Sequence, residues 1–366
     1  MSRLDELIQE YCPDGVDYKP LKDLASIDIG KFVRSDKQGD EKPYPVFNGG
    51  RRNTGMYDEY NHDGDYILIS ARGANAGYTN YFSGKYWAGN SCYSVAINPS
   101  IINYRFAYYV IKNSEQAFLG KQQTGSIPAV SKVQVSNLLI PVPPFPVQEE
   151  IVRILDTFTE LTAELTAELA ARKKQYEYYQ YELLTFDENT PLMPLKNITN
   201  VFRGEYITQK NTTPGKIPVI LGGQEPAYYI NRSNHVGEIV AIARSGVSAG
   251  FVSYWNEPIF ITDGFGYEAK IDTIKPKYLY YALKRLENNL NAMKRGAGVP
   301  HVSGEALGNV LLPVPPIDVQ ERCIKILDNF NDICTDISSG LPAEIEARQK
   351  QYEYYRDQLL TFKELK

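Results

Sequence analysis

The stretch RKKQYEYYQYELLTF at residues 172–186 returns as RQKQYEYYRDQLLTF at residues 348–362. Two other segments repeat at nearly the same distance: PLKDL at 20–24 returns as PLKNI at 194–198, and PVPP at 141–144 occurs again at 313–316. The copies lie 172 to 176 residues apart, whereas solenoid repeats have periods of roughly 20 to 50 residues. The chain is therefore a duplicated module with two whole domains and two linking elements.

The linking elements carry the heptad pattern of a coiled coil. From Ile151 to Phe186 the seam positions alternate four and three residues apart without interruption, as in helices that pack side by side along their length. A helix of about forty residues, at about 1.5 Å per residue, spans roughly 60 Å. We expect a long helix that can hold two sites at a fixed distance.

The second linking element has the same seam with one irregularity. Between Ile337 and Ile345 two steps of four residues follow each other, and Gly340 and Pro342 lie in this interval. Extra residues in a heptad pattern change the local winding, and proline interrupts the hydrogen bonds of a helix. The sequence therefore predicts a kink or break near 338–342.

The segments between the helices have short β-rich runs, such as Asp65–Ser70, broken by Gly, Asn and Pro. The predicted fold class is α+β: two duplicated β-rich domains separated by two long antiparallel coiled-coil helices, in a pseudo-two-fold, pseudo-cyclic arrangement. We interpret the start of the chain as a stub of the helix that precedes each domain. The expected boundaries are an N-terminal helical stub at 1–16, domains at 17–147 and 189–317, a central helix at 148–188 and a C-terminal helix at 318–366.

Composition excludes several classes of protein. With 366 residues and 43% hydrophobic content, each half can form its own core. No apolar run of about 18 residues and no signal stretch occurs, so we expect a cytoplasmic protein without membrane association. The four cysteines lack paired spacing, and no histidine cluster accompanies them, so neither a metal site nor a disulfide is expected.

The charge distribution is compatible with DNA binding although the net charge is −5. Residues 148–186 hold 8 acidic and 4 basic side chains, and residues 318–366 hold 10 and 7. The remainder of the chain then has 28 basic against 26 acidic side chains. The two domains are thus slightly basic, as contacts to phosphates permit.

Duplication also tests for catalysis, because a group essential to the module should occur in both copies. His301 is matched by Ala129, and the acidic residues Asp263 and Glu268 have no equivalents in the first copy. His62 and His235 share a repeat position, and we interpret them as polar loop surface. No phosphate-binding loop is present. We predict no catalytic residue.

Two loops keep one frame in both copies while their side chains differ. RGANAGY at 72–78 matches SGVSAGF at 245–251, and residues 122–131 match residues 294–303. This pattern is expected of two readers of different targets. Side chains suited to base edges or phosphates are Arg51, Arg52, Asn53, Arg72, Asn75, Lys121, Gln122 and Gln123 in the first copy, and Gln224, Arg232, Asn234, Arg244, Ser248, Lys294 and Arg295 in the second.

Tyrosines on the linking helices form a second candidate surface. Tyr178, Tyr181 and Tyr354 are the rings that we expect to project away from the helix seam. Exposed aromatic side chains on a long helix indicate that another protein docks there.

In combination these features resemble the specificity subunit (HsdS) of type I restriction-modification enzymes. The resemblance covers essentially the whole chain and rests on the Pro-Leu-Lys entrances at Pro20 and Pro194, the turn at 124–128, the Pro-Pro exits followed by Gln148-Glu149 and Gln320-Glu321, and the helix ends quoted above. It implies a non-catalytic subunit whose two target-recognition domains each read one half of a bipartite double-stranded DNA sequence, with the helices setting the gap.

The resemblance also implies partners. Two methyltransferase subunits would dock on the chain and use S-adenosylmethionine to methylate adenines, and two nuclease subunits that use ATP and Mg can be added. The chain itself is expected to bind no cofactor. The residues alone leave two alternatives open: a coiled-coil adaptor whose domains bind protein or glycan, and a subunit of a modification-only system.

Overall fold

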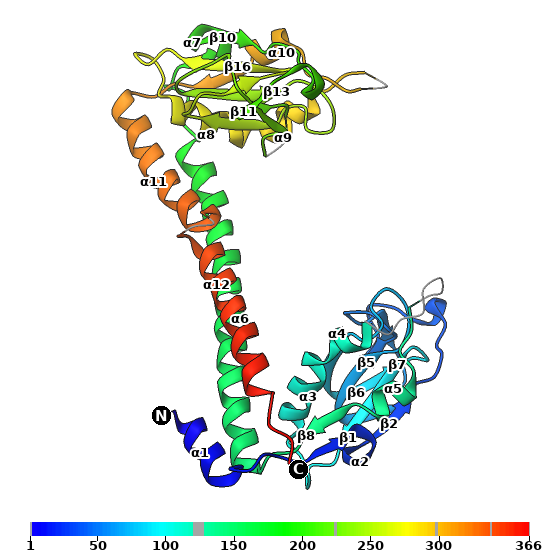
Figure 1. Cartoon of the computed structure of the whole chain (residues 1–366). Coiled ribbons are helices and arrows are strands. Elements are labelled where there is room, and N and C mark those ends of the chain that lie inside the picture. Colours follow the sequence, from blue (N-terminus) through cyan, green and yellow to red (C-terminus); the bar gives the residue numbers. More distant parts are fainter. Residues whose placement is uncertain (1, 120–127, 223–224, 297–298, 337–338, 366) are drawn as a thin grey trace. The chain divides into compact units, whose positions relative to one another are not determined.

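The computed structural model describes residues 2–119, 128–222, 225–296, 299–336 and 339–365 (Figure 1). The chain forms two compact units. The first unit comprises Met1–Glu164 with Ile345–Lys366, and the second unit comprises Leu165–Glu344. Each unit therefore contains one β-rich domain together with segments of the long helices.

A six-stranded sheet with the order β2-β7-β5-β6-β3-β4 forms the first domain. Neighbouring strands are antiparallel except β3 and β6, which are parallel. The strands are β2 Ala25–Ile29, β3 Tyr44–Phe47, β4 Gly55–Tyr57, β5 His62–Ser70, β6 Thr79–Ala88 and β7 Cys92–Ile97. The run that predicted a strand at Asp65–Ser70 belongs to β5, in which residues 67–70 are buried.

The second domain repeats this order in two sheets, β10-β16-β13-β14 and β12-β11-β15. Their strands are β10 Thr199–Arg203, β11 Pro214–Ile220, β12 Tyr228–Ile230, β13 Ile239–Ala243, β14 Val252–Trp255, β15 Phe260–Ile261 and β16 Gly264–Ala269. The long β6 of the first domain is replaced here by β14 and β15. Because residues between these two strands leave the ladder, one sheet becomes two.

One helix packs on each main sheet: α3, Tyr104–Asn113, and α8, Pro276–Arg285. The Asn103 side chain caps α3 by accepting from the backbone N–H groups of Arg105 and Phe106. The remaining short elements are β1 Tyr18–Pro20, α2 Leu21–Leu24, η1 Ser35–Lys37, α4 Glu115–Leu119, α5 Lys132–Ser136 and β8 Leu139–Pro141, and then β9 Leu192–Pro194, α7 Leu195–Ile198, η2 Gln209–Asn211, α9 Glu287–Ala292, α10 Gly304–Gly308 and β17 Leu311–Pro313.

The first linking element is one helix, α6, which runs for 39 residues from Phe145 to Leu183. It begins before the expected boundary at 148 because Pro146 lies in its first turn, where proline replaces an N–H that has no helical partner. The second linking element holds two helices, α11 Ile317–Thr335 and α12 Leu341–Leu359. The irregularity expected near 338–342 falls at this interruption, and residues 337 and 338 lie outside the described residues.

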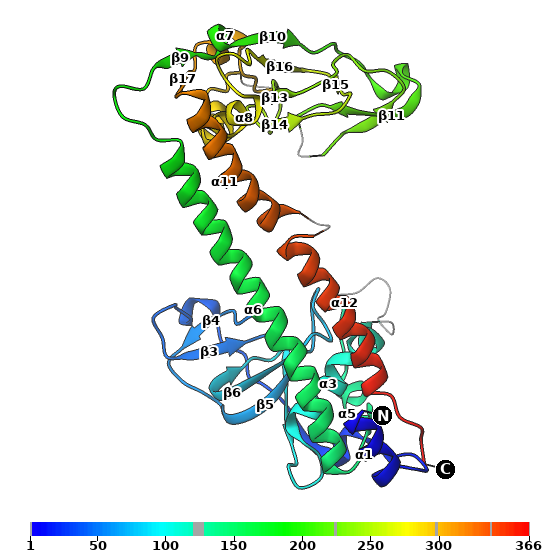
Figure 2. The same cartoon turned by 90° about the vertical axis from the view of Figure 1, so that its left-hand side faces the viewer.

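The linking helices pack antiparallel within the second unit (Figure 2). Cys323 of α11 donates a hydrogen bond to the Leu183 carbonyl of α6 at 3.3 Å, and the Phe330 ring stacks on Tyr179 with centroids 5.1 Å apart. Residues further along α11 therefore contact residues earlier in α6, so the two helices run in opposite directions. In the first unit, Phe158 of α6 stacks on Tyr355 of α12 at 5.6 Å.

The end of the chain lies beside the entrance to the first domain. Val16 donates to the Lys363 carbonyl at 2.9 Å, and the Leu365 N–H donates to the Val16 carbonyl at 3.0 Å. Gly15 permits this approach with φ +126°, because a Cβ there would lie 2.6 Å from the Lys363 oxygen. In space, the residues after α12 therefore lie at the entrance of the first domain. The end of α6 leads into the second domain in the same way. Helix α1, Arg3–Tyr11, packs Leu4 into the core of the first unit.

Candidate nucleic-acid interface

The two predicted loop frames have the same backbone geometry in both domains. Gly73 donates to the Pro128 carbonyl and Gly246 to the Pro300 carbonyl, each at 2.9 Å. Both turns then close on a second glycine with positive φ, +89° at Gly77 and +90° at Gly250. The frame is therefore fixed by glycines and backbone hydrogen bonds, which leaves the intervening side chains free to differ.

In the first domain the structure brings several candidates together. The Arg51 guanidinium lies over the Tyr78 ring at 5.6 Å, so the loop at 48–53 lies beside the turn at 72–78. Arg52 and Arg72 are exposed, and neither guanidinium makes a hydrogen bond or ion pair with another described residue. Asn53 is exposed and donates to the Gly55 carbonyl at 3.3 Å. This edge of the domain thus presents positive charge that no neighbour neutralises.

Two arginines predicted to bind DNA in the second domain are held by carboxylates. Arg232 forms a two-point ion pair with Glu205, at 2.8 and 3.3 Å, and this pair lowers the pKa of Glu205. Arg244 donates to Asp263 at 3.2 Å. Both guanidinium groups are committed to neighbouring side chains, which is a role that the sequence did not indicate.

Asp263 adopts a backbone conformation that is unusual for a residue with a side chain. Its φ is +44°, the only positive value at a non-glycine position in the described parts of the chain, and Asp is among the few residues that tolerate it. Its carboxylate accepts from both Arg244 and Ser245. Asp263 therefore holds the two residues that precede the turn at 246–250.

The two arginines that precede the turns are not equivalent. Ala71 and Arg244 occupy the same place, because Val130 donates to the Ala71 carbonyl as Val302 donates to the Arg244 carbonyl. Arg72 lies one residue further along and matches Ser245. The alignment of residues 72–78 with residues 245–251 is therefore confirmed.

The histidines that share a repeat position belong to a duplicated structural motif. Asn61 donates to the Ala88 carbonyl at 2.9 Å and accepts from the Ala88 N–H at 2.7 Å. Asn234 makes the same two hydrogen bonds to Ile261, at 2.9 and 2.8 Å. Each amide thus takes the place of a paired strand, so Asn234 is not free to bind a base. The interpretation of this position as loop surface missed that role.

The histidine that follows each asparagine is partly buried. His62 stacks on the Tyr86 ring at 5.1 Å, and burial lowers its pKa. The buried Nε2 atom of His235 has no hydrogen-bond partner among the described residues. The occurrence of His62 and His235 at the same position of the two repeats was the sequence signal that could have revealed this motif.

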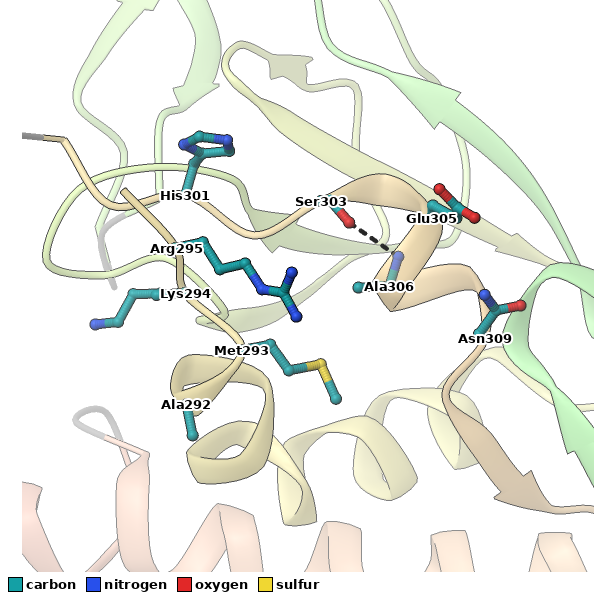
Figure 3. Close-up of a pocket in the computed structure, with 9 residues that line it drawn as sticks. All are labelled: Ala292, Met293, Lys294, Arg295, His301, Ser303, Glu305, Ala306 and Asn309. Carbon is teal, nitrogen blue, oxygen red and sulfur yellow. Dashed lines mark hydrogen bonds between the residues drawn. The ribbon is translucent and has the colours of Figure 1, made fainter. Parts of the chain in front are cut away.

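A pocket of about 510 Å³ lies at the edge of the second domain (Figure 3). Its lining combines polar and apolar groups: Ala292, Met293, Lys294, Arg295, His301, Ser303, Glu305, Ala306 and Asn309. Figure 3 shows the Arg295 guanidinium directed toward α10, while the Lys294 and His301 side chains point away from that helix. Arg295 makes no side-chain hydrogen bond or ion pair with a described residue. Among the described candidates of the second domain, Arg295 is an arginine that no carboxylate neutralises.

Three of the remaining DNA-binding candidates, Lys294, Asn75 and Ser248, lie in the described parts of the chain. Lys294 donates to the Val247 carbonyl at 3.2 Å and so joins the two loop frames. Asn75 and Ser248 lie within the matched turns, Asn75 partly exposed and Ser248 exposed. Lys121, Gln122, Gln123 and Gln224 lie outside the described residues.

A buried glutamine attaches each domain to its long helix. Gln148 donates to the Pro143 carbonyl at 2.6 Å and accepts from the Asn103 N–H at 2.7 Å. Gln320 donates to the carbonyls of Pro315 and Thr273 and accepts from the Lys275 N–H at 2.8 Å. Both side chains are fully buried. Each therefore fixes the start of its long helix to the start of the domain helix.

A carboxylate on the next turns of each long helix makes a second attachment. Asp156 accepts from Arg105 and Tyr109 of α3. Asp328 accepts from Lys277 and Tyr281 of α8, both at 2.6 Å. The sequence analysis assigned none of these residues to an attachment, although the offset of 172 between Asp156 and Asp328 is present in the sequence. Within each unit the domain is thus joined to its helix by polar contacts at two levels.

All three predicted helix tyrosines are exposed, and two of them have the same surroundings. Tyr178 and Tyr354 are 59% and 60% exposed. Each packs edge-on against the next tyrosine, at 5.5 Å for Tyr178 on Tyr179 and 5.4 Å for Tyr354 on Tyr355. Tyr181 is exposed as well and lies under the Arg285 guanidinium. The chain therefore presents the same aromatic surface once in each unit.

The cysteines, which in other proteins act as nucleophiles or metal ligands, are buried in this structure. All four cysteines are buried free thiols, and burial raises the pKa of each, that of Cys92 to about 12. They are therefore uncharged at neutral pH. Among the described residues, no group of three or more His, Cys, Asp or Glu side chains could hold a metal ion.

Comparisons with known proteins agree with this duplicated architecture. The family model described as the type I restriction modification DNA specificity domain matches the chain twice, at residues 13–172 and 188–347. A Haemophilus influenzae protein assigned by name to the type I restriction enzyme specificity subunits is 32% identical, over 95% of this chain and 96% of its own. A type I restriction enzyme specificity subunit of Escherichia coli is 33% identical over 64% of this chain and 65% of its own.

A solved structure shares the fold. The type I restriction-modification S subunit of M. genitalium superimposes with a TM-score of 0.65 at 22% identity, and the match covers 94% of this chain and 95% of that one. The chain belongs to the family of type I restriction-modification DNA specificity proteins. It is a specificity subunit with two target-recognition domains, the non-catalytic part of such a complex. No described helix is long and apolar enough to cross a membrane.

Proposed function

We propose that each target-recognition domain reads one half of a bipartite DNA sequence through its glycine-closed turn and the loop beside it. The observation that carries this proposal is a common backbone frame with different side chains, next to arginines that no carboxylate neutralises. Arg52 and Arg72 supply these cations in the first domain, and Arg295 supplies one in the second. A free guanidinium group can donate hydrogen bonds to guanine edges and phosphates. A guanidinium that is already paired with a carboxylate can do so only after that ion pair breaks.

The sequence-derived candidates then take different roles. Arg51, Arg52, Asn53, Arg72 and Asn75 read the first half-site together with the segment at 121–123. Ser248, Lys294 and Arg295 serve the second half-site. Arg232, Arg244 and Asn234 act as structural residues of the second domain. Gln224 remains a candidate by its chemistry alone.

The helices serve as a spacer whose ends are fixed to the domains. A spacer transmits a distance only if each domain keeps its orientation on the helix that carries it. The paired attachments at Gln148 with Asp156, and at Gln320 with Asp328, support this role. Gap length in the DNA target would then follow from the linking helices and not from the domains.

The repeated aromatic surface is the proposed docking site for two methyltransferase subunits. Equal exposure at Tyr178 and Tyr354 supports two equivalent sites, and aromatic side chains are common in interface centres. S-adenosylmethionine would be bound by the docked methyltransferases. Nuclease subunits that use ATP and Mg would join where the system includes restriction, and the complex would act in the cytoplasm on cellular DNA.

Methylation mapping tests the proposal most directly. DNA from cells that co-express the chain with its methyltransferase partner is sequenced by a long-read method that detects modified adenine. A split motif with modified adenines in both halves, absent without this chain, is the expected result. If the assembled complex leaves no chain-dependent methylation, the proposal is wrong.

Salt dependence of binding provides a second measurement. Contacts between arginines and phosphates release counterions, so the affinity for the target should fall steeply between 50 and 200 mM salt, by a factor on the order of 10³. A nearly constant affinity over this range would instead favour a domain that binds protein or glycan.

A further inference from the structure

The tip of the turn at 246–250 exposes an apolar side chain. Val247 is 92% exposed, more than any other large hydrophobic side chain in the described parts of the chain. It is followed by the exposed Ser248 and lies between two glycines with positive φ. An isolated exposed valine is common on protein surfaces, so its significance depends on its surroundings.

Three hydrogen bonds fix the backbone of the turn that carries Val247. Lys294 donates to the Val247 carbonyl at 3.2 Å, and Gly246 donates to the Pro300 carbonyl at 2.9 Å. Asn291 donates to the Ala249 carbonyl at 2.9 Å. The side chain is therefore presented by a fixed turn and cannot fold back into the domain to bury its methyl groups.

Lys294 and Arg295 lie on the segment beside this turn. The Lys294 side chain lies against the Val247 carbonyl, and Arg295 follows in the sequence with its guanidinium unneutralised. A second exposed valine, Val299 at 67%, precedes Pro300, whose carbonyl accepts from Gly246. An apolar tip bordered by cations suits DNA, whose phosphates bind the cations, better than a neutral protein surface.

The first domain has an apolar side chain at the same place. Ala74 matches Val247 in the common turn and is exposed. Two polar positions near the tip differ, since Arg72 and Asn75 in one copy stand where Ser245 and Ser248 stand in the other. The two copies therefore change the polar members of the turn and keep an exposed apolar group at its tip.

DNA offers one apolar feature to such a tip. In the major groove the base edges present hydrogen-bond donors and acceptors, and the C5-methyl group of thymine is the apolar exception. We infer that Val247 is a specificity-determining residue that contacts a thymine methyl group in the second half-site. This inference rests on the proposed DNA-reading function of the domain and deepens it.

The test removes the methyl group and nothing else. The complex of this chain with its methyltransferase subunits is bound to its mapped target, in which each thymine of the second half-site is replaced in turn by deoxyuridine. One replacement should lower the affinity by about three- to fivefold, the factor expected for the burial of one methyl group. The same replacements in the first half-site leave the Val247 contact unchanged.

Variants of the chain then assign the effect to this side chain. In Val247→Ser, which removes both methyl groups, the sensitive deoxyuridine position should lose most of its effect. Val236→Ser provides the matched control, because Val236 is also an exposed valine of the second domain, at 70%, but lies outside the turn. That variant should show the full three- to fivefold effect.

Each outcome separates the inference from the function on which it rests. Wild-type complex that fails to bind or methylate any split motif overturns the proposed function itself. If the motif is read but no thymine is sensitive, if the second half-site has no thymine, or if Val247→Ser leaves the sensitivity unchanged, the inference is wrong. A uniform loss of affinity for all sequences in Val247→Ser also overturns it, because that result describes a wedge between base steps.

Discussion

Replacing Gln320 with methionine should destabilise the second unit by about 3 kcal/mol. Methionine keeps the length and approximate volume of the side chain but removes both polar atoms. The carbonyls of Thr273 and Pro315 and the N–H of Lys275 then lose their partners. A buried backbone group without a hydrogen bond costs about 1 to 3 kcal/mol, and the partial exposure of Thr273 favours the lower end of that range.

The first unit provides an internal comparison. Gln148→Met removes two such hydrogen bonds, to Pro143 and Asn103, and should cost about 2 kcal/mol on the same scale. Glu149→Met and Glu321→Met place the same side chain at adjacent exposed positions. These controls should change the stability by no more than about 1 kcal/mol, since only Glu321 loses a surface ion pair.

The two tryptophans make the units distinguishable. Trp87 lies in β6 of the first unit and Trp255 in β14 of the second. Urea unfolding followed by fluorescence in a Trp87→Phe background therefore reports the second unit, and a Trp255→Phe background reports the first. If Gln320→Met unfolds at the same urea concentration as Glu321→Met, the buried amide does not stabilise the junction between domain and helix.

Four further predictions follow from single residues. Arg72→Ala should relax recognition in one half of the methylated motif only, and equal loss in both halves would contradict independent readers. Burial lowers the pKa of His62, so the unfolded chain binds its proton at higher pH than the folded chain does. Unfolding measured in urea should therefore show stability that declines below about pH 6.5, and His62→Gln should reduce that slope. Asp263→Ala should cost about 1 kcal/mol more unfolding free energy than Asp263→Asn, because alanine tolerates positive φ poorly; equal values would remove the conformational argument. Tyr354→Ala should reduce the number of bound methyltransferase subunits from two to one in analytical ultracentrifugation, whereas unchanged stoichiometry would place docking elsewhere.

Several features followed directly from local patterns in the sequence. The uninterrupted seam from Ile151 to Phe186 predicted a long helix, and α6 is one helix of 39 residues. The glycines of the two turns predicted a common frame, because only glycine readily adopts the positive φ found at Gly77 and Gly250. These are properties of a few neighbouring residues, so the sequence alone contains them.

The roles of individual polar side chains did not follow from the sequence. Arg232 and Arg72 have the same chemistry, yet Glu205 neutralises one and no described carboxylate neutralises the other. The partner of Arg232 lies 27 residues away in the chain, at a distance that no short pattern encodes. Asn234 likewise resembled a base-reading amide until its two hydrogen bonds to Ile261 were known.

The sequence by itself determined the duplication, the class of fold and the family, because repeats, heptads and glycine positions are local or periodic. The tertiary structure alone decided which cations remain unneutralised and how each domain is fixed to its helix. Those properties depend on contacts such as Gln148 with Asn103 and Asp328 with Lys277, whose members lie 45 and 51 residues apart. Charge and hydrogen bonding act through space, so they are settled only when distant parts of the chain come together.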